Sequence, residues 1–240
     1  MKMLDLRYST LDSTITCLTV LKKIYPGVKL FADESRSRSK ISIENRKKQI
    51  PTEKAEEKSV AWSDVLTWRK EHWSELNPQE KLLIALYTMR PPARADYTPM
   101  KIVKKKPSKL EDNTNYLVWN TVPYFIFHAY KTHKTYGDLK FKIMADLKRV
   151  LASWIKDHPE AVYLLQDGSN QPWTANHLSK AVQDIFQKYH GLATGITALR
   201  HSYLTEYYTD TPAILTMEKV GREMMHSIAV GQQYRHITHS

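Results

Sequence analysis

Four short stretches after residue 60 combine arginine, lysine, histidine and tyrosine in arrangements that suit chemistry on a phosphodiester. They are ALYTMRPPARADY (85–97), HAYKTHKTYG (128–137), TALRHSYLTEY (197–207) and MMHSIAVGQQYRH (224–236). Arginine forks bind the non-bridging oxygens of phosphate, lysine and histidine transfer protons, and a tyrosine hydroxyl beside cations can act as a nucleophile. Taken singly, each stretch also has an ordinary structural explanation, such as a solvated arginine or an edge lysine that discourages aggregation.

The order and spacing of these stretches resemble the catalytic domain of the tyrosine recombinase (phage-type integrase) family. The shared order is an arginine, a lysine in a hairpin, an Arg-His pair on a helix, then a histidine followed eight residues later by a tyrosine. The resemblance covers roughly residues 63–236. Within the family, the PP-x-R-x-D-Y text at 91–97 and the Y-K-T text at 130–132 are similar to integrases of virophages and related eukaryotic-virus elements. The resemblance therefore implies DNA integration by a mobile viral element.

The resemblance assigns roles to residues of the first two stretches. Arg94 corresponds to the first catalytic arginine, because it follows the diproline and precedes Asp96, where the family has an acidic residue. Arg90 is the alternative. Lys131 corresponds to the hairpin lysine that protonates the leaving 5′-oxygen, and Lys134 is its alternative.

The last two stretches complete the site that the resemblance implies. Arg200 corresponds to the second catalytic arginine, His226 to the histidine of the last motif, and Tyr234 to the nucleophile. Tyr207 and Tyr208 are less favoured as nucleophiles, because they fall inside an expected helix at core-like spacing. Two arginines beside the phosphate would stabilise the charge that grows on its oxygens in the transition state.

Three features depart from the family pattern. Thr197 stands where the family has a histidine, three residues before the second arginine; threonine is a poor general base but a good helix N-cap. His201 could take over the base role or occupy the family's second histidine position. Met225 stands where a glycine usually precedes the last histidine. Six residues follow Tyr234, fewer than the family's C-terminal docking helix needs.

The function implied is that of a site-specific DNA recombinase or integrase. Such an enzyme cleaves one strand through Tyr234, holds a 3′-phosphotyrosine and passes the strand to a partner 5′-hydroxyl, as a homotetramer on double-stranded DNA. Two alternatives stay open: a type IB topoisomerase with the same chemistry, and a catalytically inactive DNA-binding module, which Thr197 suggests. The chemistry requires no cofactor or metal, and no tight cluster of Asp, Glu and His stands out in the sequence.

The charge of the chain favours a polyanionic partner. It has 36 Lys and Arg against 25 Asp and Glu, a formal net charge of +11, which suits nucleic acid. Five lysines fall within nine residues that contain no acid: Lys101, Lys104, Lys105, Lys106 and Lys109. Together with Lys134 and His201 they are predicted to contact DNA phosphates, which fixes position without reading sequence. A solvated turn with no ligand is the alternative for this cluster.

The pattern of apolar residues predicts an α+β fold, mainly α, with helices around a small antiparallel sheet. A helix starts at Asn77-Pro78, where Asn caps, Pro takes the first position and Glu80 completes a capping box. Short runs of aromatic and β-branched residues predict strands at 97–103, 116–120, 124–130 and 140–143, with a hairpin turn at 135–138. Helical spacing predicts further helices at 144–158, 174–189, 197–208 and 211–225.

The first 60 residues are expected to form a short helical segment and a charged linker, a reduced form of the family's core-binding region, before a catalytic domain at 61–240. Residues 32–60 hold eight Lys or Arg and six Asp or Glu with no aromatic residue. Cys17 is the single cysteine, so no disulfide framework is expected. No apolar run approaches the roughly 18 residues of a membrane helix, so no membrane partner is expected. The chain reads as intracellular, in the host nucleus or in a viral factory in the cytoplasm.

Overall fold

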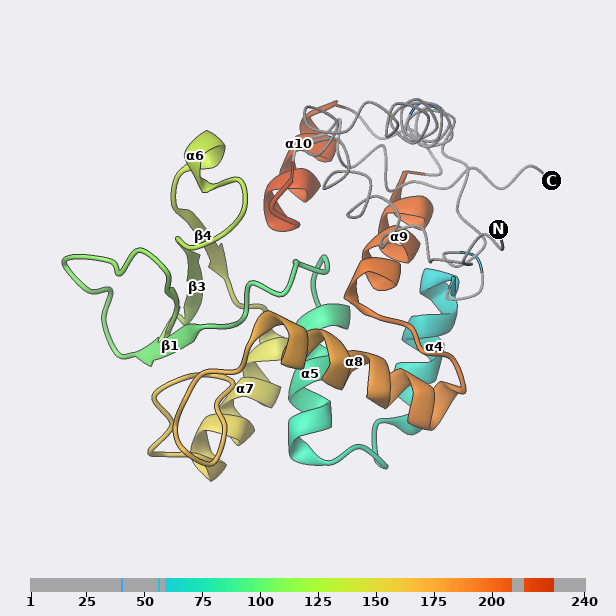
Figure 1. Cartoon of the computed structure of the whole chain (residues 1–240), viewed down its shortest axis with the longest axis horizontal. Helices are drawn as coiled ribbons and strands as arrows, with labels where there is room; N and C mark the ends of the chain where they lie inside the picture. The colour runs from blue at the N-terminus through green and yellow to red at the C-terminus, as the bar shows by residue number, and fades with distance from the viewer. Residues whose placement is uncertain (1–39, 41–55, 57–58, 209–213, 227–240) are drawn as a thin grey trace, which may run out of the picture. The chain divides into compact units, whose positions relative to one another are not determined.

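The computed structural model describes residues 59–208 and 214–226, together with residues 40 and 56 (Figure 1). The chain divides into two compact units, Met1–Pro51 and Thr52–Ser240, and all described residues except residue 40 belong to the second. The helical segment and the linker expected at 1–60 lie almost wholly outside the described residues. Tyr234 also lies outside them.

The described part of the chain contains seven helices and one four-stranded sheet. The helices are α4 (Trp62–His72), α5 (Pro78–Thr88), α6 (His133–Tyr136), α7 (Ala145–Asp157), α8 (Ala175–His190), α9 (Ile196–Tyr207) and α10 (Ile214–Glu223). The strands are β1 (Met100–Val103), β2 (Asn115–Val118), β3 (Tyr124–Phe127) and β4 (Leu139–Lys142). Two helices precede the sheet and the longer helices follow it, which confirms the predicted α+β, mainly α, class. None of the described helices is long and apolar enough to cross a membrane.

The sheet has the order β1-β2-β3-β4 and differs from the prediction in one pairing. β2–β3 and β3–β4 are antiparallel, as expected, but β1 and β2 run parallel, with Met100 opposite Asn115. The physical reason is the connection at 104–114, which is too long for a tight hairpin and returns the chain to the end where β1 began. The other side of β1 is covered by hydrogen bonds to the 162–164 segment.

The connection between β3 and β4 is longer than predicted. β3 ends at Phe127 and β4 begins at Leu139, and the short helix α6 lies between them. The hairpin turn expected at 135–138 is therefore wrong, because residues 133–136 close a helical turn instead. Gly137 ends that turn with a positive φ of 63° and donates its N–H to the His133 carbonyl oxygen. Lys131 lies in this connection.

Helix α5 stands at the centre of the main hydrophobic core. The predicted capping box is present: the Asn77 side chain accepts from the Glu80 N–H, and the Glu80 carboxylate accepts from the Asn77 N–H. All seven residues from Leu82 to Thr88 are buried, and α5 packs against both α7 and α8. Each fully buried Leu or Ile contributes roughly 1.5–3 kcal/mol. The end of α5 is thereby fixed, and the Pro91-Pro92 segment and Arg94 follow directly from it.

A smaller apolar cluster joins α9 to α10. It consists of Leu204, Tyr208, Met217, Val220 and Met224. Because Met224 directly follows α10, this cluster holds the carboxyl end of α10 against α9, the helix that carries Arg200.

Candidate functional site

The site is organised around the carboxyl end of α10, where the backbone forms a Schellman motif. Met225 takes the left-handed conformation, with φ 57°. Its N–H donates to the Arg222 carbonyl oxygen at 3.0 Å, and the His226 N–H donates to the Gly221 carbonyl oxygen at 2.8 Å. These are the two bonds of the motif, and they fix His226, which is 1% exposed, directly after the helix. The glycine expected from the family pattern is thus replaced by a methionine that still adopts the left-handed backbone.

Gly221 makes room for this turn, and the sequence analysis missed it. A Cβ at this position would lie 2.8 Å from the His226 carbonyl oxygen, closer than ordinary contacts allow. The signal available in the sequence was a glycine inside an expected helix, which often has a packing reason.

Three arginines donate to three consecutive backbone carbonyl oxygens at this end of α10. Arg90 Nη2 reaches the Glu223 oxygen at 3.3 Å, Arg200 Nη1 the Met224 oxygen at 3.1 Å, and Arg94 Nη1 the Met225 oxygen at 2.7 Å. The last carbonyls of a helix lack partners within it and carry partial negative charge. The arginines therefore both cap α10 and come together around its end.

The surroundings of Arg90 and Arg94 differ. The Arg90 guanidinium donates to the Tyr97 hydroxyl at 3.0 Å, and its carbon lies 5.0–5.6 Å from the ring centres of Phe125, Phe127 and Phe141. Such packing on aromatic faces is a structural role. Arg94 is half-buried and its guanidinium contacts the backbone at Met225.

Arg200 is among the largest fully buried side chains, with 2% exposure. Besides the Met224 oxygen, its Nη1 donates to the Pro92 carbonyl oxygen at 2.8 Å. This bond ties α9 to the diproline segment, so Arg200 and Arg94 approach the same end of α10 from two sides.

Asp96 is a half-buried residue whose carboxyl group lies near both of these arginines. Burial raises its pKa to about 6, although the charges of Arg94 and Arg200 act in the opposite direction. Its Oδ2 is buried without a hydrogen-bond partner among the described residues. The desolvation of the carboxylate therefore outweighs the attraction of the two cations.

The β3–β4 connection also contacts the carboxyl end of α10. The Thr132 hydroxyl donates to the Met225 carbonyl oxygen at 3.1 Å, the acceptor that Arg94 also uses. Lys131, next to Thr132, is exposed, and so is Lys134 in α6. The structure thus brings the segment of Lys131 to the site of Arg94, Arg200 and His226.

Helix α9 carries two further residues of the predicted site, Thr197 and His201. Thr197 is exposed and is the second residue of α9, whose N-cap is Gly195. The N-cap expected at Thr197 is wrong, because the actual N-cap lies two residues earlier. His201, which follows Arg200 on α9, is half-buried.

The tyrosines at the end of α9 are packing residues. The Tyr207 ring stacks on Tyr203 with centres 5.6 Å apart, and Tyr208 is 1% exposed within the smaller apolar cluster. Burial raises the pKa of both Tyr207 and Tyr208 above the usual range. A raised pKa makes the phenolate scarcer, which is the opposite of nucleophile activation.

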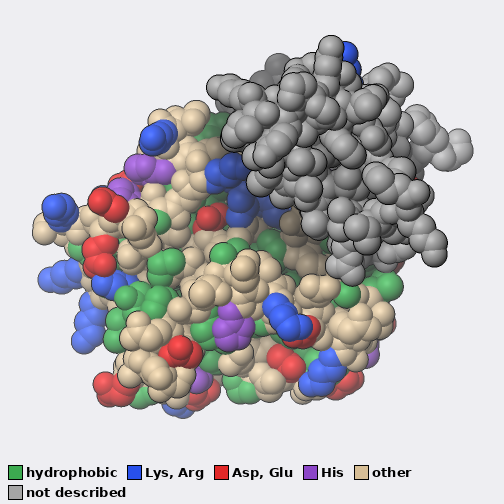
Figure 2. Space-filling view, viewed as in Figure 1, with side chains coloured by type: hydrophobic (Ala, Val, Ile, Leu, Met, Phe, Trp, Pro, Cys, Tyr) green, Lys and Arg blue, Asp and Glu red, His purple; other side chains and the backbone are tan. Residues whose placement is uncertain are grey.

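The predicted lysine cluster divides in two. Lys101 is neutralised by Glu111, with Nζ 2.6 Å from the carboxylate oxygen. The other four lysines, Lys104, Lys105, Lys106 and Lys109, are exposed in the β1–β2 connection. Figure 2 shows Lys and Arg side chains at the edge of the molecule near β1, and others in the middle of the same face.

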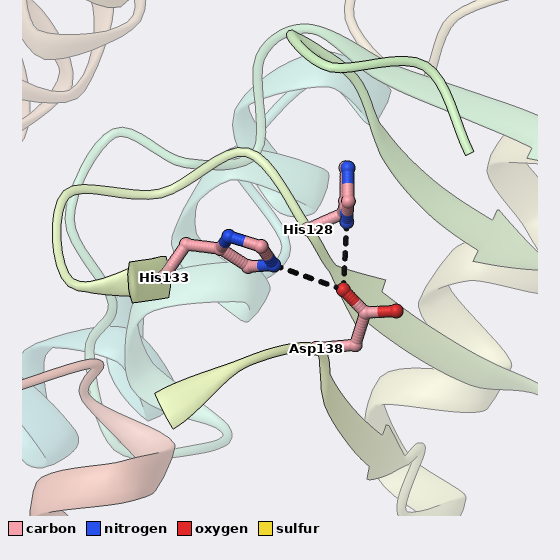
Figure 3. A group of neighbouring side chains, drawn as sticks. All are labelled: His128, His133 and Asp138. Atoms are coloured by element: carbon pink, nitrogen blue, oxygen red, sulfur yellow. Dashed lines mark hydrogen bonds and ion pairs between the residues drawn. The ribbon is translucent and has the colours of Figure 1, made fainter. Parts of the chain in front are cut away.

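One cluster of potential metal ligands was not predicted from the sequence. His128, His133 and Asp138 each offer a ligand atom, and these atoms all lie within 4.8 Å of one another (Figure 3). The sequence did not suggest them as a cluster because their closeness depends on how the β3–β4 connection folds.

Comparisons with known proteins support the fold. No family model matches the chain, and no curated protein does. Among solved structures the chain is similar to one titled "Crystal structure of XerA recombinase", with a TM-score of 0.53 and 12% identity, over 75% of this chain and 59% of that one. The chain thus matches about three-fifths of that protein's length, and its fold is similar to that of a tyrosine recombinase.

Proposed function

We propose that this chain is a DNA strand-transfer enzyme of the tyrosine recombinase type, with Arg94, Lys131, Arg200, His226 and Tyr234 as its catalytic residues. It would act on double-stranded DNA as a homotetramer, in the integration of a viral or other mobile element. The similarity of fold to a solved recombinase supports the class, and the residues around α10 support the chemistry.

The observation that carries the proposal is the convergence of three separate segments on the Met224–His226 backbone. Arg200 comes from α9, Arg94 from the segment after α5, and Thr132 from the β3–β4 connection beside Lys131. A purely structural role for these residues does not require that the two motif arginines, the hairpin lysine segment and the motif histidine meet at one place.

The arrangement suggests a division of work on a phosphodiester. Arg94 and Arg200 would bind the non-bridging oxygens and stabilise their growing charge. The Tyr234 hydroxyl oxygen would form a bond to phosphorus as its own proton passes to a base. The bond from phosphorus to the 5′-oxygen would break, and Lys131 would donate the proton that the leaving oxygen needs. No metal enters these steps.

A catalytically inactive DNA-binding module remains the second candidate. Two observations favour it: Thr197 is exposed where the family has a histidine, and all three arginines also cap α10, a task that an inactive protein would share. Such a module would bind DNA without forming a covalent bond to it.

The test is covalent trapping. The full chain is incubated with nicked double-stranded DNA, in which the short cleaved fragment diffuses away, and the products are separated under denaturing conditions. We expect a protein–DNA adduct in the unmodified chain and in Tyr207→Phe, and none in Tyr234→Phe. An adduct that persists in Tyr234→Phe would show that another residue attacks. Absence of an adduct in the unmodified chain, together with retained DNA binding, would favour the inactive module. In a separate assay, relaxation of supercoiled DNA without strand exchange would favour a topoisomerase.

A further inference from the structure

The β3–β4 connection holds a compact group of two imidazoles and one carboxylate. His128 Nδ1 lies 2.6 Å and His133 Nε2 lies 3.0 Å from the same oxygen, Asp138 Oδ1. Figure 3 shows one ring nitrogen of each histidine directed at this oxygen. Two ring nitrogens therefore converge on one carboxylate oxygen, and all three atoms lie within 4.8 Å of one another.

Two of the three residues lie directly beyond the last residue pair of β3 and β4. Phe127 of β3 is paired with Leu139 of β4, so His128 and Asp138 form the next position beyond this pair. The backbone N–H of His128 donates to Asn115 Oδ1 at 2.8 Å, and Asn115 is 1% exposed. The distance between the two ligands is thus fixed by strand pairing and by a buried amide.

The third residue is held by local bonds. His133 begins α6, and its carbonyl oxygen accepts from the Gly137 N–H at 2.7 Å. The Tyr130 hydroxyl donates to the Gly137 carbonyl oxygen at 2.6 Å, and its ring packs edge-on against His133 with centres 5.7 Å apart. The His133 ring is therefore oriented by its neighbours as well as by Asp138.

We propose that His128, His133 and Asp138 bind a divalent transition-metal ion of the Zn²⁺ class. Imidazole nitrogen and carboxylate oxygen bind Zn²⁺ at about 2.0–2.2 Å, which places neighbouring ligand atoms of a tetrahedral ion about 3.4 Å apart. To reach this geometry the two contacts to Asp138 lengthen by less than about 1 Å, and the two imidazole nitrogens, which lie within 4.8 Å of each other, shift by at most about 1.4 Å. A set with two imidazoles suits Zn²⁺, Co²⁺ or Ni²⁺, whereas Mg²⁺ and Ca²⁺ prefer oxygen ligands.

The exposure of the three side chains leaves a position open for solvent. Their exposed fractions are 20% for His128, 35% for His133 and 39% for Asp138. A fourth ligand is therefore water or a group from a partner. Because Lys131 lies between His128 and His133 in the chain, a bound ion would restrain the backbone on which that lysine is mounted. This inference goes beyond the proposed function and does not depend on it.

The test is a titration of the full chain with Co²⁺, whose visible absorption reports tetrahedral coordination, followed by displacement with Zn²⁺. Variants His133→Gln and Asp138→Asn each remove one ligand. The matched control is His72→Gln, because His72 forms a similar pair with Glu75, 3.2 Å apart, in α4 and away from the connection. Circular dichroism checks that each variant folds.

We expect one Zn²⁺ equivalent with a tetrahedral Co²⁺ spectrum in the unmodified chain and in His72→Gln. Affinity should fall by more than about 100-fold in His133→Gln and Asp138→Asn, since loss of even a supporting outer-shell group costs 10–100-fold. Zn²⁺ should also slow tryptic cleavage after Lys131 and Lys134 in the unmodified chain. Equal binding by the unmodified chain and both ligand variants, or no Zn²⁺-dependent protection and no tetrahedral spectrum, would overturn the proposal and leave only a hydrogen-bonded clamp.

Discussion

Arg94 and Thr132 donate hydrogen bonds to the same acceptor, the carbonyl oxygen of Met225, at 2.7 Å and 3.1 Å. One residue follows α5 and the other lies in the β3–β4 connection, and the end of α10 contacts both of them. The left-handed backbone of Met225 turns the chain at this point. The backbone after α10 is thus the common support of the arginine segment and the lysine segment.

The first prediction concerns Gly221. Replacing glycine by alanine inside a helix normally stabilises it by about 0.5–1 kcal/mol, but here the new Cβ would lie 2.8 Å from the His226 carbonyl oxygen. We expect Gly221→Ala to lower the free energy of unfolding and to displace His226, measured by chemical denaturation and by the rate of adduct formation. Gly195→Ala is the control, because a Cβ there meets nothing within 4 Å. Equal or greater stability of Gly221→Ala would contradict the tight packing of this turn.

The second prediction concerns the pH dependence of stability through Asp96. Its pKa in the folded protein, about 6, lies above the ordinary 3.8, so the folded state favours the protonated carboxyl. The stability associated with that protonation is complete below the ordinary pKa and is lost as pH rises through 6. Asn cannot ionise, so the free energy of unfolding of Asp96→Asn relative to the unmodified chain should rise by about 3 kcal/mol between pH 3.5 and pH 8.

The measurement for Asp96 is urea denaturation across this pH range. Asp112→Asn is the control, since Asp112 is exposed in the β1–β2 connection, and its difference from the unmodified chain should stay nearly constant. A difference for Asp96→Asn that is flat or falls with pH would show that the two arginines, rather than burial, control this carboxyl group.

The third prediction concerns DNA binding by the exposed lysines. Replacing Lys104, Lys105 and Lys106 together with Ala should make the slope of log K against log salt shallower by up to about 2.7, because each phosphate contact contributes about 0.9. Sequence preference should stay unchanged. A control variant removes three exposed lysines of α4, α7 and α8: Lys70, Lys156 and Lys180. If both triple variants change the slope equally, the β1–β2 connection is not a distinct DNA contact.

The fourth prediction separates the two candidate first arginines. Arg94→Ala should slow adduct formation by about 10²–10³, the usual cost of one transition-state donor, with DNA affinity within a few-fold. Arg90→Ala should chiefly lower the free energy of unfolding, because it loses the aromatic packing and a hydrogen bond to the end of α10. The protein that remains folded should form the adduct at the normal rate. The reverse pattern, in which Arg90→Ala forms no adduct and Arg94→Ala forms it normally, would show that Arg90 is the first catalytic arginine.

Local patterns in the sequence were sufficient to predict much of the fold. The Asn77–Glu80 capping box and the apolar run after it depend on neighbours within one turn, and α5 begins where this signal predicts. The four strands also lie close to their predicted positions, because aromatic and β-branched runs are local signals. The parallel pairing of β1 with β2 was not predictable in this way, since it depends on the path of an irregular connection.

The candidate site was accessible from sequence through motif order, but its supports were not. The resemblance assigned roles to Arg94, Arg200 and His226, and in the structure all three lie at the carboxyl end of α10. The capping of α10 by arginine arises from contacts between segments far apart in the chain. The need for Gly221 and the cluster of His128, His133 and Asp138 arise from the conformation of a turn and a loop. No periodicity in the sequence encodes such contacts.

The final prediction tests Lys131 as the proton donor to the leaving 5′-oxygen. Lys131→Ala should slow cleavage of ordinary DNA by about 10²–10⁴, the usual contribution of general acid catalysis. In DNA whose bridging 5′-oxygen is replaced by sulfur, the leaving group is a thiolate of far lower basicity, with a pKa of about 8.5 for a comparable thiol, and needs no donated proton. Cleavage by Lys131→Ala should therefore recover on this substrate, whereas Arg200→Ala should stay slow on both, because phosphate charge still needs stabilisation.

Lys134→Ala serves as the matched control from the same connection and should cleave both substrates at the normal rate. If Lys134→Ala shows the sulfur-dependent recovery instead, the proton comes from α6, and if neither variant shows it, the donor lies outside this connection.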